Sequence, residues 1–153
     1  MELKFEVSGR ISKPIDEVFE AVVNPKQLSK YFTTGGADGR LETGVIVYWK
    51  FAEFPDSFPV KVLKVEKNRR IIFQWESDDS GKDGQESYNT TVTMRFEELD
   101  GNRTLVSIAE EGWHQTPAGQ TASYGNCMGW SQMLCALKAH LEYGINLRDN
   151  MYK

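Results

Sequence analysis

Two adjacent glutamates and a histidine, Glu110, Glu111 and His114, lie at and just beyond the end of a strand-like segment. The alternation of Val106, Ile108 and Glu110 points the first carboxylate toward the apolar side of that strand. Burial raises the pKa of a carboxyl group and leaves it in need of hydrogen-bond donors. Such a group can bind a ligand hydroxyl or act as a general base.

Three roles for Glu110 are open at this level. The structural role is a buried ion pair with Arg95 or Arg103, which would satisfy the carboxylate without a ligand. The binding role is a hydrogen bond to a ligand, with Tyr88 as a second polar group. The catalytic role is that of general base in a reaction of cyclase or hydrolase type. The pattern favours the structural role over the other two.

Other catalytic or metal-binding patterns are missing from the sequence. A nucleophilic triad needs a Ser or Cys beside an oriented His, and one of the two histidines, His140, is expected on the solvent side of a helix. Cys127 and Cys135 are about 12 Å apart along that helix, too far for a disulfide. We interpret them as small apolar residues in a reducing compartment. Neither residue type shows metal-ligand spacing, so we expect no catalytic residue, no metal and no cofactor.

Aromatic and methionine side chains form the second group that could make a site. Most should lie in the core, but a concave sheet facing one helix is hard to fill and favours a pocket. The segment 53–60 (EFPDSFPV) is predicted to form a lip over its mouth. The predicted ligand-binding residues are Phe32, Trp49, Phe51, Phe54, Trp75, Tyr88, Met94, Glu110, Trp113, Met128 and Met133.

One long amphipathic helix and a sheet must position these groups. Apolar residues at alternating three- and four-residue spacing predict a helix from about Thr121 to Tyr143. Its apolar face comprises Cys127, Trp130, Leu134, Leu137 and Leu141, widened by Met128, Met133 and Cys135. Two short helices are expected near the N-terminus, one beginning around Pro14 and one covering 25–32.

Alternating segments predict six or seven antiparallel strands, joined by turns such as Asp100-Gly101. The strands are expected at 3–11, 45–54, 59–66, 70–78, 88–97 and 103–111, with Arg40 to Glu42 in a short additional strand. Strands followed by one long helix make an α+β fold. We expect a single domain over residues 1–153.

Four motifs carry a family resemblance over essentially the whole chain. They are KPIDEVFEAVVNPKQLSKYF (13–32), RRIIFQWES (69–77), TLVSIAEEGW (104–113) and GWSQMLCALKAHLE (129–142). Together they resemble the START-like (SRPBCC) superfamily and its branch named after the activator of heat-shock protein 90 ATPase. The resemblance implies a helix-grip fold, in which a curved antiparallel sheet wraps around the last helix and encloses a cavity. Members bind lipids, sterols, polyketides or plant hormones, and some are cyclases or hydrolases.

The bulk properties narrow the expected partners. A formal net charge of −4 disfavours nucleic acid, and no apolar run approaches the ~20 residues of a membrane span. The alternating N-terminus lacks the apolar block of a signal peptide, which favours the cytoplasm.

The predicted function is non-enzymatic binding of a small hydrophobic or amphipathic molecule of lipid, sterol or aromatic type. The alternatives are a chaperone (heat-shock protein 90) ATPase regulator and an enzyme that uses Glu110. The co-factor that gives the branch its name has a further N-terminal domain that is not expected here, and this argues against chaperone activation. An open strand edge would allow a monomer or a homodimer.

Overall fold

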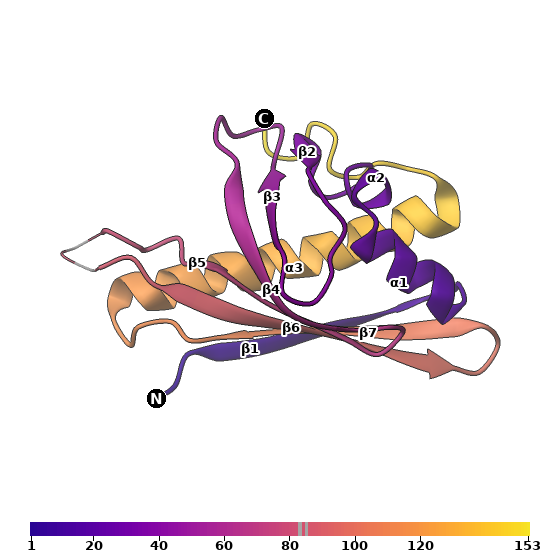
Figure 1. Cartoon of the computed structure of the whole chain (residues 1–153), viewed down its shortest axis with the longest axis horizontal. Coiled ribbons are helices and arrows are strands. Elements are labelled where there is room, and N and C mark those ends of the chain that lie inside the picture. The colour runs from indigo at the N-terminus through magenta and orange to yellow at the C-terminus, as the bar shows by residue number, and fades with distance from the viewer. Residues whose placement is uncertain (83, 85) are drawn as a thin grey trace.

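A computed structural model describes residues 1–82, 84 and 86–153. All seven strands belong to one antiparallel sheet, in the order β1-β7-β6-β5-β4-β3-β2 (Figure 1). The elements along the chain are β1 (Lys4–Ile11), α1 (Ile15–Val23), α2 (Pro25–Leu28), β2 (Gly36–Ala37), β3 (Ile46–Lys50), β4 (Phe58–Glu66), β5 (Arg70–Glu76), β6 (Asn89–Leu99), β7 (Arg103–Glu111) and α3 (Pro117–Tyr143).

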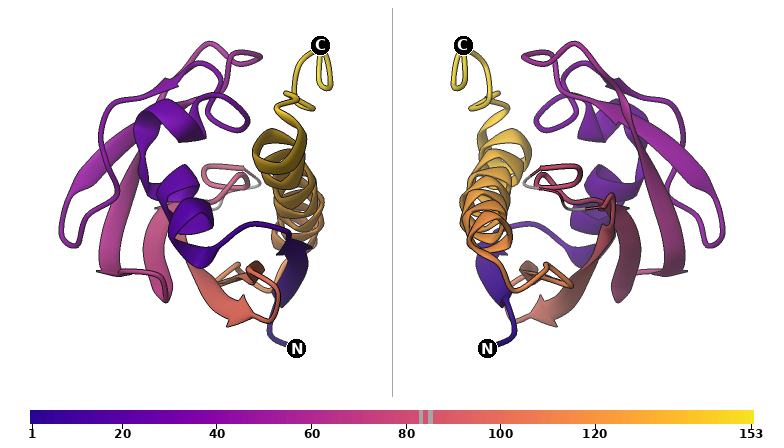
Figure 2. Two further views of the ribbon diagram at one scale, coloured as in Figure 1. Left: turned by 90° about the vertical axis from the view of Figure 1, so that its right-hand side faces the viewer. Right: turned by 90° about the vertical axis from the view of Figure 1, so that its left-hand side faces the viewer.

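The sheet is strongly curved, and α3 runs across the hollow opposite β3 and β4 (Figure 2). The first strand pairs with the last, from Lys4 opposite Glu111 to Ile11 opposite Thr104. Helix α1 packs on β6 and β7, where the rings of Phe19 and Phe96 meet edge to face at 4.9 Å. The predicted α+β architecture of a curved sheet closed by a long C-terminal helix is confirmed.

Alternation places one face of each central strand in the core, as the sequence predicts. In β6 the buried residues are Thr90, Val92, Met94 and Phe96, and in β7 they are Thr104, Val106, Ile108 and Glu110. The predicted hairpin between these strands is also present, with Gly101 and Asn102 at positive φ. Glu110 therefore points inward, toward α3.

Helix α3 begins about four residues earlier than predicted because the chain supplies a start signal there. Thr116 caps the helix by accepting a hydrogen bond from the Gly119 amide, and Pro117 occupies the first helical position. The helix ends at Tyr143, as predicted, and Gly144 takes a left-handed conformation with φ +65°. Among the described residues, no helix is both long and apolar enough to cross a membrane.

Two backbone expectations are wrong. The short extra strand is Gly36–Ala37, which pairs with β3, and not Arg40 to Glu42. That segment instead carries Leu41 into the core, with the Leu41 amide bonded to the Val23 carbonyl. The second short helix ends at Leu28 rather than continuing to residue 32.

Two side-chain expectations on α3 are also wrong. Cys135 and Met128 are exposed, so they do not widen the buried apolar face. His140 is half-buried instead of solvated, because Tyr31 and Gln27 from the α2 region cover that side of the helix. Its ring stacks on Tyr31 at 5.2 Å and its Nε2 lies 2.9 Å from Gln27 Oε1.

Candidate ligand-binding cavity

A cavity of about 540 Å³ lies between α3, the strands β4 and β5, the β3–β4 connection and the C-terminal segment. This volume is within the range of roughly 300–1,000 Å³ that small-molecule sites occupy. Its aromatic wall consists of Phe32, Phe51, Phe54, Phe58, Trp75 and Trp130. Its charged and amide groups come from Asp56, Glu76, Asp78, Asn126, Gln132 and Arg148.

Five of the predicted ligand-binding residues line this cavity. They are Phe32, Phe51, Phe54, Trp75 and Met128. Phe54 and Met128 are half exposed, at 50% and 57%, and so belong to its rim. The segment predicted to form a lip contributes Phe54, Asp56 and Phe58 to the cavity lining.

The other aromatic and methionine predictions lie elsewhere. Trp49 and Met94 are fully buried core residues. Trp113 is buried against Phe5, with stacked rings 5.5 Å apart. Met133 is buried and faces a second, smaller pocket. These residues do not line the larger cavity, since each has its own packing partner in the core.

The carboxylate of Glu110, with only 1% of the residue exposed, forms the polar centre behind the aromatic wall. Oε1 accepts from Trp130 Nε1 at 2.8 Å, and Oε2 accepts from Trp75 Nε1 at 2.9 Å. Thr90 Oγ1 donates to Oε2 at 2.6 Å, and Asn126 Nδ2 lies 3.1 and 3.0 Å from the two oxygens. Four side chains from β5, β6 and α3 therefore converge on one carboxylate.

These partners determine the protonation state that fits Glu110. Indole and amide N–H groups only donate, so they match an ionised carboxylate that accepts at both oxygens. Burial raises the pKa of Glu110, while the bonds from Thr90, Trp75, Trp130 and Asn126 pull it back down. The net pKa lies above its ordinary value of 4.5.

The structural alternative for Glu110, an ion pair with an arginine, is wrong. Arg95 and Arg103 are exposed, Arg95 within β6 and Arg103 at the start of β7. None of the ion pairs among the described residues involves Glu110. Its negative charge is held by neutral dipoles alone.

Tyr88, expected beside Glu110, belongs to a separate cluster. Its hydroxyl donates to Asp79 and accepts from the His114 amide at 3.1 Å, and its ring stacks on His114 at 3.7 Å. Burial raises the pKa of Asp79, but hydrogen bonds from Ser77 and Tyr88 outweigh it and lower the net pKa. This cluster anchors the end of β5 to the start of β6 and α3.

The mouth of the cavity is closed on one side by the C-terminal segment. Arg148 pairs with Glu53 at 3.3 Å, and both side chains are about nine-tenths buried. The guanidinium lies 4.3 Å from the Phe51 ring centroid and 4.5 Å from that of Tyr152. This contact ties the C-terminus to the β3–β4 connection.

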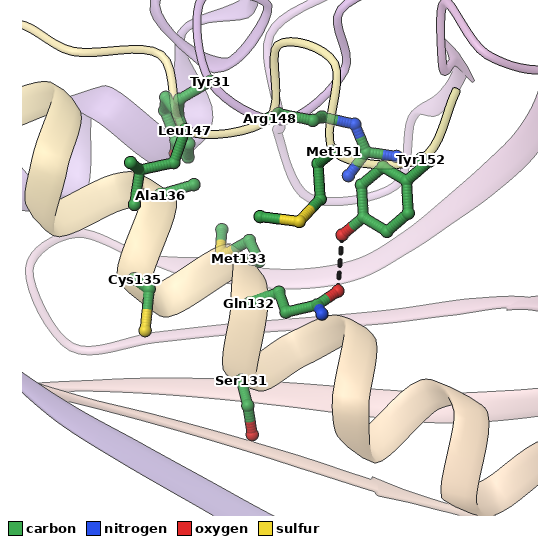
Figure 3. A pocket seen from close by; sticks show the side chains of 10 residues that line it. All are labelled: Tyr31, Ser131, Gln132, Met133, Cys135, Ala136, Leu147, Arg148, Met151 and Tyr152. Carbon is green, nitrogen blue, oxygen red and sulfur yellow. Dashed lines mark hydrogen bonds between the residues drawn. The ribbon is translucent and has the colours of Figure 1, made fainter.

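A second pocket of about 270 Å³ lies on the other side of Arg148, between α3 and the C-terminal segment (Figure 3). Met133 and Cys135 line it, and the Tyr152 hydroxyl donates to Gln132 Oε1 at 2.6 Å. No group of three or more His, Cys, Asp or Glu residues in the described part of the chain could hold a metal ion.

Sequence reasoning missed several lining residues. Asn126 and Trp130 are four apart on α3, a spacing that puts both on the face toward Glu110. Gly125 and Gly129 have the same spacing and line the cavity. Arg148 carried no signal, because it follows the helix in a segment without periodicity.

The curved antiparallel sheet, the long C-terminal helix across it and the cavity between them define a helix-grip protein of the START-like class. The family model described as "Activator of Hsp90 ATPase homolog 1-like protein" matches residues 12–142. The chain belongs to this family. No curated protein matches the chain.

Solved structures share the fold. Protein SSP2350 from Staphylococcus saprophyticus is 25% identical, with a TM-score of 0.77 and coverage of 95% of this chain and 96% of that one. The Aha1 dimer from Colwellia psychrerythraea is 20% identical, with a TM-score of 0.72 and coverage of 92% and 97%. DynU16, described as a putative protein in the dynemicin biosynthetic locus, is 20% identical, with a TM-score of 0.77 and coverage of 94% and 49%.

Proposed function

We propose that this protein binds a small hydrophobic or amphipathic molecule in the cavity between α3 and the sheet, without converting it chemically. The observation that carries the proposal is the aromatic wall of a space of about 540 Å³. Rings that pack to surround open space supply apolar area and a defined shape to a ligand. The free thiols Cys127 and Cys135 fit our expectation that it does so in the cytoplasm.

Two glycines of α3 support the same conclusion. Gly125 and Gly129 lie inside a 27-residue helix, where glycine costs about 1 kcal/mol relative to alanine. Neither has a positive φ, and a Cβ at either position would meet no atom within 4 Å. Neither conformation nor crowding requires glycine there, and side chains at these positions would reduce the space beside the aromatic wall.

The geometry argues against Glu110 as a general base. A base must reach the proton that it removes, yet Glu110 is buried behind Trp75 and Trp130 and already accepts from four donors. Glu110 instead fixes the orientation of both indoles and of Asn126, which line the cavity.

Gly129→Leu tests the proposal because it fills the cavity without an evident clash. We expect unchanged or higher stability, since leucine is the better helix former, together with loss of binding by at least tenfold. The assay is a thermal-shift panel of lipids, sterols and aromatic polyketides, followed by calorimetric titration of each hit. Thr121→Leu, at an exposed position of α3 away from the cavity, is the matched control. Equal binding by Gly129→Leu and the wild type would reject the cavity as the site.

A second candidate is regulation of a heat-shock protein 90 ATPase, for which the family membership is the support. The structure of Aha1 from Colwellia psychrerythraea is described as a dimer, which makes a homodimer a related proposal. An ATPase assay with the bacterial chaperone tests the first, and light scattering of the purified chain tests the second. Unchanged turnover at saturating protein would remove the chaperone proposal, and a monomeric mass would remove the dimer.

A further inference from the structure

The described residues that line the cavity carry more negative than positive charge, and Lys153 Nζ lies 5.6 Å from the ring centroid of Phe54 at its rim. Three carboxylates, Asp56, Glu76 and Asp78, line it. Partial burial of the Asp78 carboxyl disfavours its charged form and raises its pKa, and the nearby Asp79 adds to the rise while Lys82 opposes it. Among the described lining residues the only cation is Arg148, and it already pairs with Glu53. A positively charged guest would meet three carboxylates in this lining.

A further negative charge lies directly behind the aromatic wall. The Glu110 carboxylate is held by neutral donors and has no cationic partner among the described residues. A buried charge that has hydrogen bonds but no counter-charge remains electrostatically unbalanced. A cation in the cavity would sit on the far side of two indoles from that charge and would balance it through a medium of low dielectric constant.

The indoles of Trp75 and Trp130 lie between the Glu110 carboxylate and the cavity and favour a cation there. Trp75 and Trp130 both donate N–H to Glu110, and their rings stack with centroids 5.3 Å apart. Hydrogen bonds polarise the groups that make them, and donation to a carboxylate leaves the indole ring richer in electrons. Tryptophan is already the best ring for a cation–π contact. Phe51, Phe54 and Phe58 extend the aromatic wall around Trp75.

We propose that the ligand of this cavity is an organic cation: an ammonium group on an aromatic or aliphatic skeleton, seated against Trp75 with Glu110 as its buried counter-charge. The inference rests on the proposed function, because it names the chemical class of the molecule bound at the same site.

Arg148 does not oppose a cation in this geometry. Its charge is neutralised by Glu53 and spread over the rings of Phe32, Phe51 and Tyr152, and its Nε is out of reach of solvent. It lies where the C-terminal segment closes the mouth of the cavity, over the rings of Phe32 and Phe51. An anionic guest would have to compete with Glu53 for it.

Three probes with one skeleton test the proposal: 2-(1-naphthyl)ethylamine, 2-(1-naphthyl)ethanol and 1-naphthylacetate, titrated calorimetrically at pH 7 and low salt. They are cationic, neutral and anionic. We expect the amine to bind about tenfold more tightly than the alcohol, a difference of about 1.4 kcal/mol that lies between the values for an exposed and a desolvated cation–π contact. The acetate should bind more weakly than the alcohol.

Variants that each lack a negative charge test which carboxylate causes the preference for the amine. Glu110→Gln should reduce the advantage of the amine over the alcohol at least threefold. The pair Asp56→Asn and Glu76→Gln, at exposed positions of the rim, serves the same purpose if Glu110→Gln folds poorly. Glu98→Gln removes the same charge from an exposed position of β6 and should change nothing.

The outcomes separate the two proposals. An amine preference that shrinks in the cavity variants and not in Glu98→Gln supports the cation. Equal binding of the three probes, or tightest binding of the acetate, overturns it while the cavity remains a ligand site. If none of the probes and no member of the wider panel binds, the proposed function fails and this inference with it.

Discussion

Replacing Glu110 by leucine removes the one acceptor shared by four side chains. Leucine is close in size, so the change removes the carboxylate and leaves the donors of Trp75, Thr90, Trp130 and Asn126 in place. A buried donor left without a partner costs about 1–3 kcal/mol. The effect on folding therefore depends on how many of the four can find another acceptor.

Two of these donors have an alternative and two do not. Asn126 is half-buried and lines the cavity, where water can accept its protons, and the Thr90 hydroxyl can rotate. The indole N–H groups of Trp75 and Trp130 are fixed by ring packing against Phe73 and against each other. Two orphaned donors give a loss of about 2–6 kcal/mol. Relief from burying a charge offsets part of this, so we expect about 2–4 kcal/mol.

Urea unfolding at pH 7, followed by far-UV circular dichroism, measures this difference if the slope of the free energy against urea is the same in both proteins. Glu111→Leu is the control, since Glu111 is the exposed neighbour on the same strand and should stay within about 0.5 kcal/mol of the wild type. A Glu110→Leu variant as stable as the wild type would refute the reasoning, because the indoles would then not depend on the carboxylate.

Three further predictions follow from single contacts. Burial raises the pKa of Glu110 above 4.5. The stability of the wild type relative to Glu110→Gln should therefore be greatest below pH 4.5 and fall as the pH rises through the raised pKa of the folded protein. A difference in unfolding free energy that stays flat between pH 4 and 8 would contradict this. Burial, and secondarily Lys30, lowers the pKa of His140 below 6.5. The wild type should therefore lose stability as the pH falls through and below 6.5, whereas His140→Phe, which keeps the stacking on Tyr31, should not. Parallel curves of unfolding free energy against pH for the two proteins would count against this prediction. Gly119→Ala should destabilise the protein strongly, since its Cβ would lie 1.9 Å from the His114 carbonyl oxygen. Gly125→Ala places its Cβ in open space and should stabilise the protein by up to about 1 kcal/mol. Melting temperatures of the two variants that shift in the same direction would contradict this prediction.

The inward direction of Glu110 could be predicted because it depends only on the two-residue period of one strand. Its partners could not. Trp75 lies 35 residues earlier, and Asn126 and Trp130 lie 16 and 20 residues later on a helix. Which side of that helix faces β7 depends on how α3 docks across the sheet, and the helical period alone does not determine it. An arginine partner was therefore as plausible from spacing as the indoles.

Local sequence patterns mispredicted a side chain's position where contacts with distant segments of the chain determine it. Tyr88 continues the alternation of β6 on paper, but the strand begins at Asn89 and the ring turns to His114 instead. His140 was expected on the solvent side of α3, but it follows the buried Leu137 by three residues and so lies beside the apolar face, where Gln27 and Tyr31 cover it. Four of the six residues of the aromatic wall were predicted. The other two were not, because aromatic composition predicts burial and only the curvature of the sheet decides which rings face open space.

A crystal structure of the protein with bound 2-(1-naphthyl)ethylamine tests the central claim most directly. We predict that the naphthyl group packs in the cavity against Phe51, Phe58 and Trp75, with its ammonium group over the Trp75 ring and separated from Glu110 by the indoles. The molecule found only in the smaller pocket beside Cys135, or on the outer face of the sheet, would contradict it.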